Sequence, residues 1–101
     1  MIYKIVIDEE AIADIQETAV WYDDAQKGLG KRFKTQVKNQ INGLKNAPFI
    51  GSFKTETTRG LLVKKFPFII YYVVDKTTAI IEIHAVLHTS RNPKIWQSRV
   101  R

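Results

Sequence analysis

The chain has 101 residues, a length that accommodates one hydrophobic core, so we expect residues 1–101 to form a single domain. Its composition, 45% hydrophobic and 26% charged, is that of an ordinary folded protein. Cysteine is absent, which excludes disulfides and thiolate-bound metals and suits a cytoplasmic location. No apolar run approaches the roughly 18–20 residues of a membrane span, so we expect no membrane partner.

The net charge of +6 is unevenly distributed along the chain. Residues 1–50 hold 7 basic and 7 acidic side chains, whereas residues 51–101 hold 9 basic and 3 acidic ones. This asymmetry favours an acidic or polyanionic partner for the second half. The alternative is that the excess charge only keeps the protein soluble.

The first half of the chain predicts a strand followed by two helices. Residues 2–7 are rich in β-branched types and lack the order of a signal peptide, which indicates a strand. Asp8 is expected to cap a helix, and Glu9 and Glu10 suit the positive end of that helix. Its apolar stripe has helical spacing and consists of Ile12, Ile15, Ala19 and Tyr22.

A break at Gly28 and Gly30 separates this helix from a second one, which Pro48 and Gly51 end. The second helix has an apolar face of Leu29, Phe33, Val37, Ile41 and Leu44, and an opposite face of Lys31, Lys34, Lys38 and Lys45. Two such helices predict an antiparallel hairpin whose apolar stripes face a sheet. Trp21 lies off the apolar stripe, either packed at the edge of the hairpin, which we favour, or exposed as a partner contact.

The second half of the chain predicts three strands and a short helix. Strands are expected at 61–66, 68–74 and 80–87, with a bend at Pro67 and a turn at 75–78. The continuously apolar segment 68–74 is typical of a central strand covered on both faces. Strict alternation would place Ile81, Ile83, Ala85 and Leu87 on one face of the last strand, opposite Ile80, Glu82, His84 and Val86. With a helix from Lys94 to about Arg99, the order is β-α-α-β-β-β-α, an α+β fold.

The loop after the last predicted strand holds a group of polar residues, 88–92, that are suited to bind or act on a ligand. Arg91 offers a planar fork for a phosphate, and His88 can transfer a proton near neutral pH. Trp96 can stack on a base, although a Trp in this position more often anchors a helix to a sheet. The structural alternatives are that Arg91 pairs with a carboxylate and that His88 caps a turn.

A metal site is not expected. Glu82, His84 and His88 share one face of the last predicted strand, but the two histidines are roughly 13 Å apart at about 3.3 Å per residue. That separation is too large for both to bind one ion.

An ordered set of motifs runs through nearly the whole chain. It comprises Ala11-x-x-Asp14-Ile15, Trp21-Tyr22, Gly30-x-Arg32-Phe33, Leu44-x-x-x-Pro48, Arg59, Phe66-Pro67-Phe68-Ile69-Ile70-Tyr71-Tyr72 and Ala85-Val86-Leu87-His88-x-x-Arg91-x-Pro93-x-x-Trp96-x-x-Arg99. This set resembles the RelE/ParE superfamily of toxins from type II toxin–antitoxin systems, which also act in plasmid stabilisation. The resemblance implies a small, mainly antiparallel sheet packed against a helical hairpin, growth inhibition, and neutralisation by a cognate antitoxin whose flexible segment wraps the toxin. It implies no cofactor.

The resemblance leaves two targets open, the ribosome with its mRNA and DNA gyrase. RNA-cutting members similar to RelE carry Lys and Arg on the middle strands, where this chain has Gly60, Leu62 and Phe68. They often end in a Tyr where this chain has Trp96, which cannot transfer a proton. We therefore favour inhibition of DNA gyrase, as in ParE, over ribosome-dependent mRNA cleavage. A noncatalytic, degenerate relative that binds only antitoxin or nucleic acid is the third alternative.

Two sets of site residues follow from this interpretation. If the protein is a ribonuclease, His88 and Arg91 are the expected catalytic residues. A single basic face is expected to contact the target and to include Arg59, Lys64, Lys65, Arg91, Trp96 and Arg99.

Overall fold

The computed structural model describes residues 2–99 of the chain. Its secondary structure agrees with the predicted order except for one additional short strand. The elements are β1 (Lys4–Ile7), α1 (Glu9–Ala25), α2 (Leu29–Gly43), β2 (Ser52–Phe53), β3 (Thr58–Leu62), β4 (Phe68–Asp75), β5 (Ile80–His88) and α3 (Pro93–Gln97).

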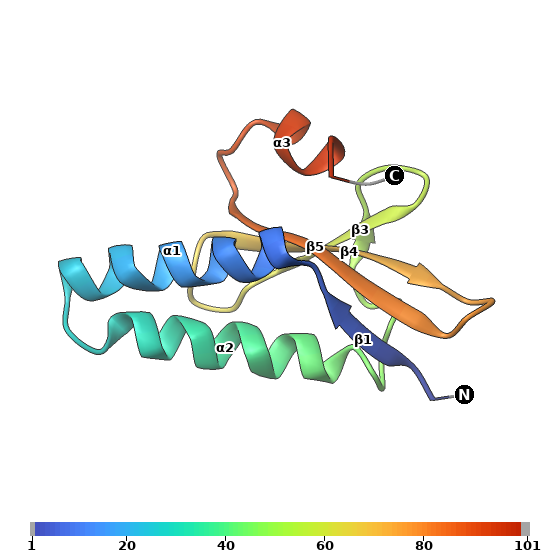
Figure 1. Cartoon of the computed structure of the whole chain (residues 1–101), viewed down its shortest axis with the longest axis horizontal. Coiled ribbons are helices and arrows are strands. Elements are labelled where there is room, and N and C mark those ends of the chain that lie inside the picture. Colours follow the sequence, from blue (N-terminus) through green and yellow to red (C-terminus); the bar gives the residue numbers. More distant parts are fainter. Residues whose placement is uncertain (1, 100–101) are drawn as a thin grey trace.

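The five strands form one sheet in the order β1-β5-β4-β3-β2, in which only the β1–β5 pair is parallel. The helices α1 and α2 form a hairpin on one face of the sheet, and the short α3 lies on the other face (Figure 1). We call these the hairpin face and the α3 face. The fold is therefore α+β, and the apolar segment predicted to be central is β4, the middle strand, with a helix layer on each side.

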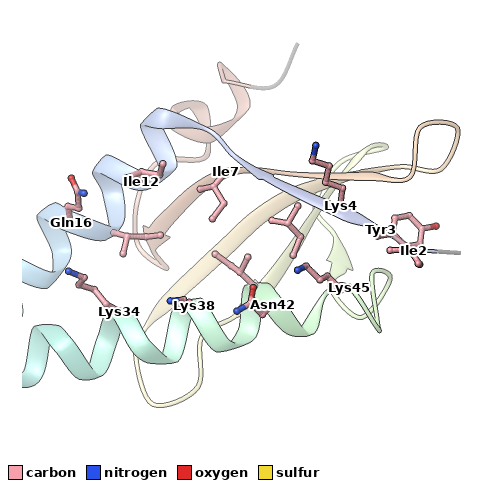
Figure 2. Close-up of a pocket in the computed structure, with 13 residues that line it drawn as sticks. Ile2, Tyr3, Lys4, Ile7, Ile12, Gln16, Lys34, Lys38, Asn42 and Lys45 are labelled. Carbon is pink, nitrogen blue, oxygen red and sulfur yellow. The ribbon is translucent and has the colours of Figure 1, made fainter.

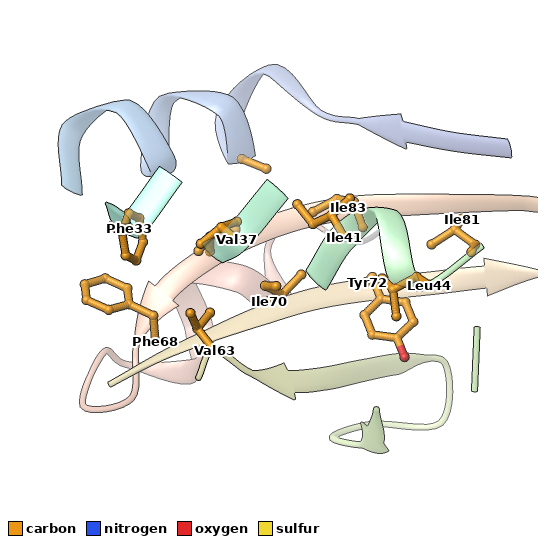
Figure 3. Packing of buried hydrophobic residues seen from close by; sticks show 12 residues of the cluster. Phe33, Val37, Ile41, Leu44, Val63, Phe68, Ile70, Tyr72, Ile81 and Ile83 are labelled. Carbon is orange, nitrogen blue, oxygen red and sulfur yellow. The ribbon is translucent and has the colours of Figure 1, made fainter. Parts of the chain in front are cut away.

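The main core lies between the hairpin and the sheet (Figure 3). Phe33, Val37 and Ile41 of α2 point toward the sheet, as their spacing predicted, and are almost completely buried. They pack on residues of the hairpin face that include Phe68, Ile70, Tyr72, Ile81, Ile83 and Val86. Because the predicted stripe of α2 makes this contact, the opposite lysine face of α2 is left exposed to solvent.

A bulge in β5 corrects the predicted alternation of that strand. Tyr71 pairs with Ala85 and Tyr72 pairs with Ile83, so His84 has no partner on β4. After the bulge, Val86 points to the same core as Ile83, whereas Ala85 packs in a second cluster on the α3 face. Strict alternation had placed Val86 with His84 and Ala85 with Ile83, and both assignments were wrong.

The β3–β4 hairpin also differs from the prediction. Strand β3 ends at Leu62, so Lys64 and Lys65 lie in the turn rather than in the strand. Lys65 has a φ of 71°, a left-handed conformation that ends the extended segment. Strand β2, which was not predicted, has only two residues and forms the edge of the sheet beside β3.

The turn between the two helices depends on two glycines. Gly28 has a φ of 89°, a conformation that favours glycine over other residues. Gly30 lies against α1, where a Cβ would be 2.1 Å from the carbonyl oxygen of Ala19. The backbone N–H of Gly30 donates to the Asp23 carboxylate across the same contact. The two helices can therefore approach closely only with glycine at position 30.

Trp21 does not pack inside the hairpin as we favoured, because 64% of its surface is exposed. It contacts Tyr22 edge-on, with ring centroids 5.1 Å apart. Its exposure corresponds to the alternative interpretation, a contact residue for a partner.

Among the described helices, none has the length and apolar character needed to cross a membrane.

Candidate functional site

A groove with a volume of about 680 Å³ lies where the two helices separate toward β1 (Figure 2). Isoleucines of β1 and α1, among them Ile5, Ile7, Ile12 and Ile15, form its apolar wall. Across the groove, α2 contributes Lys34, Lys38 and Asn42, and Lys45 follows just after the helix. β1 is an edge strand, paired only with β5, so its other edge faces away from the sheet.

The lysine edge of this groove continues along the outside of the hairpin. A neighbouring hollow shares Gln16, Lys34 and Lys38 with the groove and adds Val20 and Lys31, among others. Val20 and Ile12 are exposed on the same flank of α1. The groove and this hollow together form one long apolar surface with cations along one side, which we call the lysine-edged groove. It suits an elongated segment that is apolar on one side and acidic on the other.

The predicted pair His88 and Arg91 lies at the end of the sheet next to the β3–β4 turn. The backbone N–H of Thr89 donates to the carbonyl of Pro67 over 2.9 Å, which joins the two loops. Lys64 and Lys65 of that turn therefore lie at the same end of the sheet as His88 and Arg91. Arg91 is exposed, and no ion pair within residues 2–99 involves it.

His88 is held by its own loop and by the core. Its Nδ1 accepts a hydrogen bond from the backbone N–H of Ser90 over 3.1 Å, and its ring packs edge-on against Phe68. Because a backbone N–H can only donate, the proton of the neutral ring must be on Nε2. The free nitrogen of His88 is thus a hydrogen-bond donor in the neutral state.

Arg59 has a structural role away from these residues. Its guanidinium donates to the carbonyl oxygens of Phe49 and Gly51 over 3.1 and 2.8 Å. It also lies over the ring of Phe53, 3.9 Å from the centroid. Arg59 therefore fixes the loop that follows α2 to the edge of the sheet through one of its terminal nitrogens.

Trp96 and Arg99 attach the C-terminal segment to the α3 face. The Trp96 ring is only 4% exposed and stacks on Tyr71, with centroids 4.5 Å apart. Arg99 forms two hydrogen bonds to the Asp14 carboxylate, at 2.6 and 3.2 Å, and an ion pair with Glu10 at 3.0 Å. The hydrogen bond to Asp14 raises the pKa of Arg99. In this conformation Trp96 anchors a helix, and Arg99 is not a free surface charge.

A broad hollow of about 870 Å³ on the α3 face is mainly acidic. His84 lies within it, with Nδ1 2.6 Å from the carboxylate of Asp8 and Nε2 3.5 Å from that of Glu82. The other carboxylates that line the hollow belong to Glu9, Glu10 and Asp75, against the cations Lys76 and Arg99. Such a surface repels a phosphate backbone.

No group of three potential metal ligands occurs within residues 2–99.

Comparison with known protein families matches residues 5–93 to the ParE toxin of type II toxin–antitoxin systems, parDE. This match covers most of the chain.

The chain belongs to the ParE toxin family.

Solved structures show the same fold at low sequence identity. The chromosomal ParDE system of P. aeruginosa gives a TM-score of 0.76 at 15% identity, over 86% of this chain and 96% of that one. A mutant of the E. coli toxin RelE in the free state gives 0.71 at 15% identity, over 98% and 94%. The RelBE2 toxin–antitoxin complex of Mycobacterium tuberculosis gives 0.64 at 18% identity, over 87% and 99%. No curated protein sequence matches the chain.

For this ParE-family chain, the six residues proposed for one target-contacting face do not lie together. Lys64, Lys65 and Arg91 are exposed at one end of the sheet, together with His88. Arg59 anchors a loop, whereas Trp96 and Arg99 anchor the C-terminal segment. The net charge of the second half gave no indication of this division, because Asp14, the partner of Arg99, is 85 residues away in sequence.

The lysine-edged groove and the acidic hollow were not identified from the sequence. The lysine stripe of α2 was visible as a pattern, but its apolar counterpart comes from β1 and α1. The acidic hollow combines the start of α1 with β4 and β5, so no local pattern could reveal it.

Proposed function

We propose that this protein is a growth-inhibiting toxin, neutralised by a cognate antitoxin, that acts by inhibiting DNA gyrase without catalysing a reaction. Membership of the ParE toxin family supports the toxin–antitoxin assignment. One solved structure with the same fold is RelE bound to a peptide of the antitoxin RelB. For this chain we propose the lysine-edged groove as the antitoxin site, because an acidic amphipathic segment complements its apolar wall and its cations.

The acidic character of the α3 face supports DNA gyrase, rather than mRNA, as the target. A nuclease that cuts RNA on this face would need cations at the scissile phosphate. Instead, Asp8 and Glu82 flank His84 there, and Arg99 is occupied by Asp14. Trp96 is buried against Tyr71 and has no proton to transfer. A protein-binding poison needs none of this chemistry.

Ribosome-dependent mRNA cleavage is the second candidate, and the arrangement at the other end of the sheet favours it. His88, Arg91, Lys64 and Lys65 are brought together there by the hydrogen bond between Thr89 and Pro67. In that case His88 would exchange a proton with the reacting 2′-oxygen or the leaving oxygen, and Arg91 would stabilise the charge on the phosphate. The Nε2–H of His88 would be the catalytic donor.

Induction of the toxin in growing bacteria separates these functions. We expect double-strand DNA breaks and an SOS response, with translated mRNA intact, and purified gyrase should lose supercoiling activity in the presence of the chain. Cleavage of translated mRNA that disappears in His88→Ala or Arg91→Ala would reject the gyrase proposal, provided both variants remain folded. Equal growth when the toxin is expressed alone and when it is expressed with its antitoxin, at equal toxin levels, would reject both functions.

A further inference from the structure

A separate hollow of about 260 Å³ lies on the flank of α1 opposite the lysine-edged groove. Its helical side is one stripe at spacings of three and four residues, formed by Asp14, Glu17, Thr18 and Trp21. Its sheet side consists of Phe68, Val86, Leu87, His88 and Arg91. We propose that this hollow binds one unpaired nucleotide of a single-stranded nucleic acid.

Trp21 supplies the surface for the base. The Trp21 ring lines the hollow and is 64% exposed, so its face is available to a ligand. Its edge-on contact with Tyr22 holds the indole while leaving most of its surface accessible. Aromatic side chains of this kind stack on unpaired bases in proteins that bind single strands.

Arg91 and His88 supply groups for the phosphate. Arg91 is exposed, and among residues 2–99 no carboxylate is paired with it. Its backbone N–H donates to the carbonyl of His88, which fixes the two residues relative to each other. The Nε2–H of His88 adds a second donor, since Nδ1 is occupied by Ser90. A planar guanidinium beside a neutral donor suits a phosphate group.

The carboxylates of the hollow favour a base with an amino group. Asp14 is engaged by Arg99 and by the backbone N–H of Val86 at 3.0 Å, so its charge is already neutralised. Glu17 has no ion pair within the described part of the chain. A carboxylate can only accept hydrogen bonds, so Glu17 favours bases with an exocyclic amino group, such as cytosine. In uracil and thymine, the single N–H of the pairing edge lies between two carbonyl oxygens, which repel a carboxylate.

The nucleotide must be unpaired for two reasons. Stacking on Trp21 requires a base face that a duplex covers, and Glu17 reads a base edge that pairing would occupy. This site goes beyond the proposed function, because binding here requires neither gyrase nor cleavage of the strand. The nucleotide can come from RNA or from melted DNA, and both offer the same base and phosphate chemistry.

The test uses the purified full chain, freed from antitoxin, and short oligonucleotides with a fluorescent label. We expect C-rich RNA and DNA strands to bind, U- or T-rich strands to bind more weakly, and Glu17→Gln to reduce this difference. Trp21→Ala and Arg91→Ala should each weaken binding about tenfold, the order expected for loss of one stacked base or one phosphate contact. Lys54→Ala removes the same charge at an exposed position outside the hollow and should change affinity much less.

Intrinsic fluorescence gives an independent readout of the site. Iodide should quench the exposed Trp21 and not the buried Trp96, and a bound oligonucleotide should protect Trp21 from iodide. Equal loss of affinity in Arg91→Ala and Lys54→Ala, or no protection of Trp21, would overturn the proposal in favour of nonspecific attraction. Preference for DNA over RNA of the same sequence, or the reverse, identifies the source of the nucleotide. Equally tight binding of duplex DNA also contradicts the proposal.

Discussion

The carboxylate of Asp8 lies 2.6 Å from Nδ1 of His84, which joins the start of α1 to the bulge in β5. Asp8 occupies the N-cap position of α1, but its side chain makes no capping hydrogen bond. The sequence predicted a local role, whereas the contact spans 76 residues of the chain. At the bulge His84 and Ala85 both lie on the α3 face, and this contact holds His84 there while Val86 returns to the main core.

We predict that Asp8→Ala destabilises the protein through His84 rather than through helix capping. The expected loss in the free energy of unfolding is about 1 kcal/mol, a typical value for one side-chain hydrogen bond. A double-mutant cycle with His84→Gln, followed by urea unfolding, checks the cause. If Asp8→Ala costs the same in both backgrounds, the side chain acts on the helix alone and the prediction is wrong.

The pair Asp14 and Arg99 should contribute more to stability. Both side chains are largely buried, at 10% and 15% exposure, and the Asp14 carboxylate also accepts from the Val86 N–H. Asp14→Ala leaves a buried guanidinium without its partner, so we expect a loss of about 3 kcal/mol. Glu10→Gln, at the exposed end of the same network, should cost less than about 1 kcal/mol. Thermal unfolding of the two variants compares these losses directly.

Gly30 and Gly43 provide a matched pair of substitutions in α2. A Cβ at Gly30 would collide with the Ala19 carbonyl at 2.1 Å, whereas one at Gly43 meets no atom within 4 Å. We expect Gly30→Ala to lower the free energy of unfolding by about 3 kcal/mol and Gly43→Ala to raise it by about 0.5 kcal/mol. Similar results for both substitutions would contradict the close approach of the helices.

The features that the sequence predicted correctly are those with a local pattern. The stripe containing Phe33 and Val37 repeats along one helix, and the apolar run at 68–74 is long enough to indicate a central strand. The Phe-Pro bend and the order of elements follow from similar local signals. These were enough to predict the fold apart from β2, the bulge and the exact position of β3.

The features that it did not predict depend on contacts between distant residues. The bulge at His84 is accompanied by the contact with Asp8, and nothing within β5 distinguishes it from regular alternation. Arg99 looks like a surface cation until the fold brings Asp14 to it. Trp21 was assigned to the hairpin because an aromatic residue beside an apolar stripe is usually buried, and only packing decides which flank of α1 is covered.

Tyr72 gives a prediction for stability at high pH. Its hydroxyl donates to the Pro48 carbonyl and accepts from the Gly51 N–H, and burial raises the pKa of Tyr72 despite that N–H and Arg59. The folded state therefore holds the proton more tightly than the unfolded state, whose tyrosines titrate near pH 10. The resulting stability is complete below about pH 10 and is lost as the pH rises toward the folded-state pKa.

We expect Tyr72→Phe to reduce this alkaline loss while lowering stability at pH 7. The variant cannot ionise, but it leaves the buried Gly51 N–H without its acceptor, which should cost about 2 kcal/mol. Urea unfolding at pH 7, 9 and 11 measures both effects. Burial raises the pKa of Tyr71 and Tyr22 as well, so part of the alkaline loss should remain in the variant. A loss identical to that of the wild type would show that Tyr72 does not contribute.

The lysines of the groove should control antitoxin binding without affecting toxicity. Lys34 and Lys38 line the groove beside the isoleucines of β1 and α1 (Figure 2). Trp21 lines the separate hollow on the other flank of α1. We expect the double variant Lys34→Glu, Lys38→Glu to bind the antitoxin at least about tenfold more weakly, with a smaller dependence on salt. Ile12→Asp, which introduces a charge into the apolar wall, should weaken binding without changing the cations.

Binding is measured with the purified antitoxin encoded beside the toxin gene, and toxicity is measured by growth after induction of each toxin alone. Lys27→Glu supplies the control, because it reverses a charge in the turn between the helices, outside the groove. The groove variants should still arrest growth but should no longer be rescued when the antitoxin is co-expressed. Full rescue of the double variant and of Ile12→Asp, at equal protein levels, would place the antitoxin elsewhere on the toxin. Loss of growth arrest in a folded groove variant would instead assign these lysines to the target.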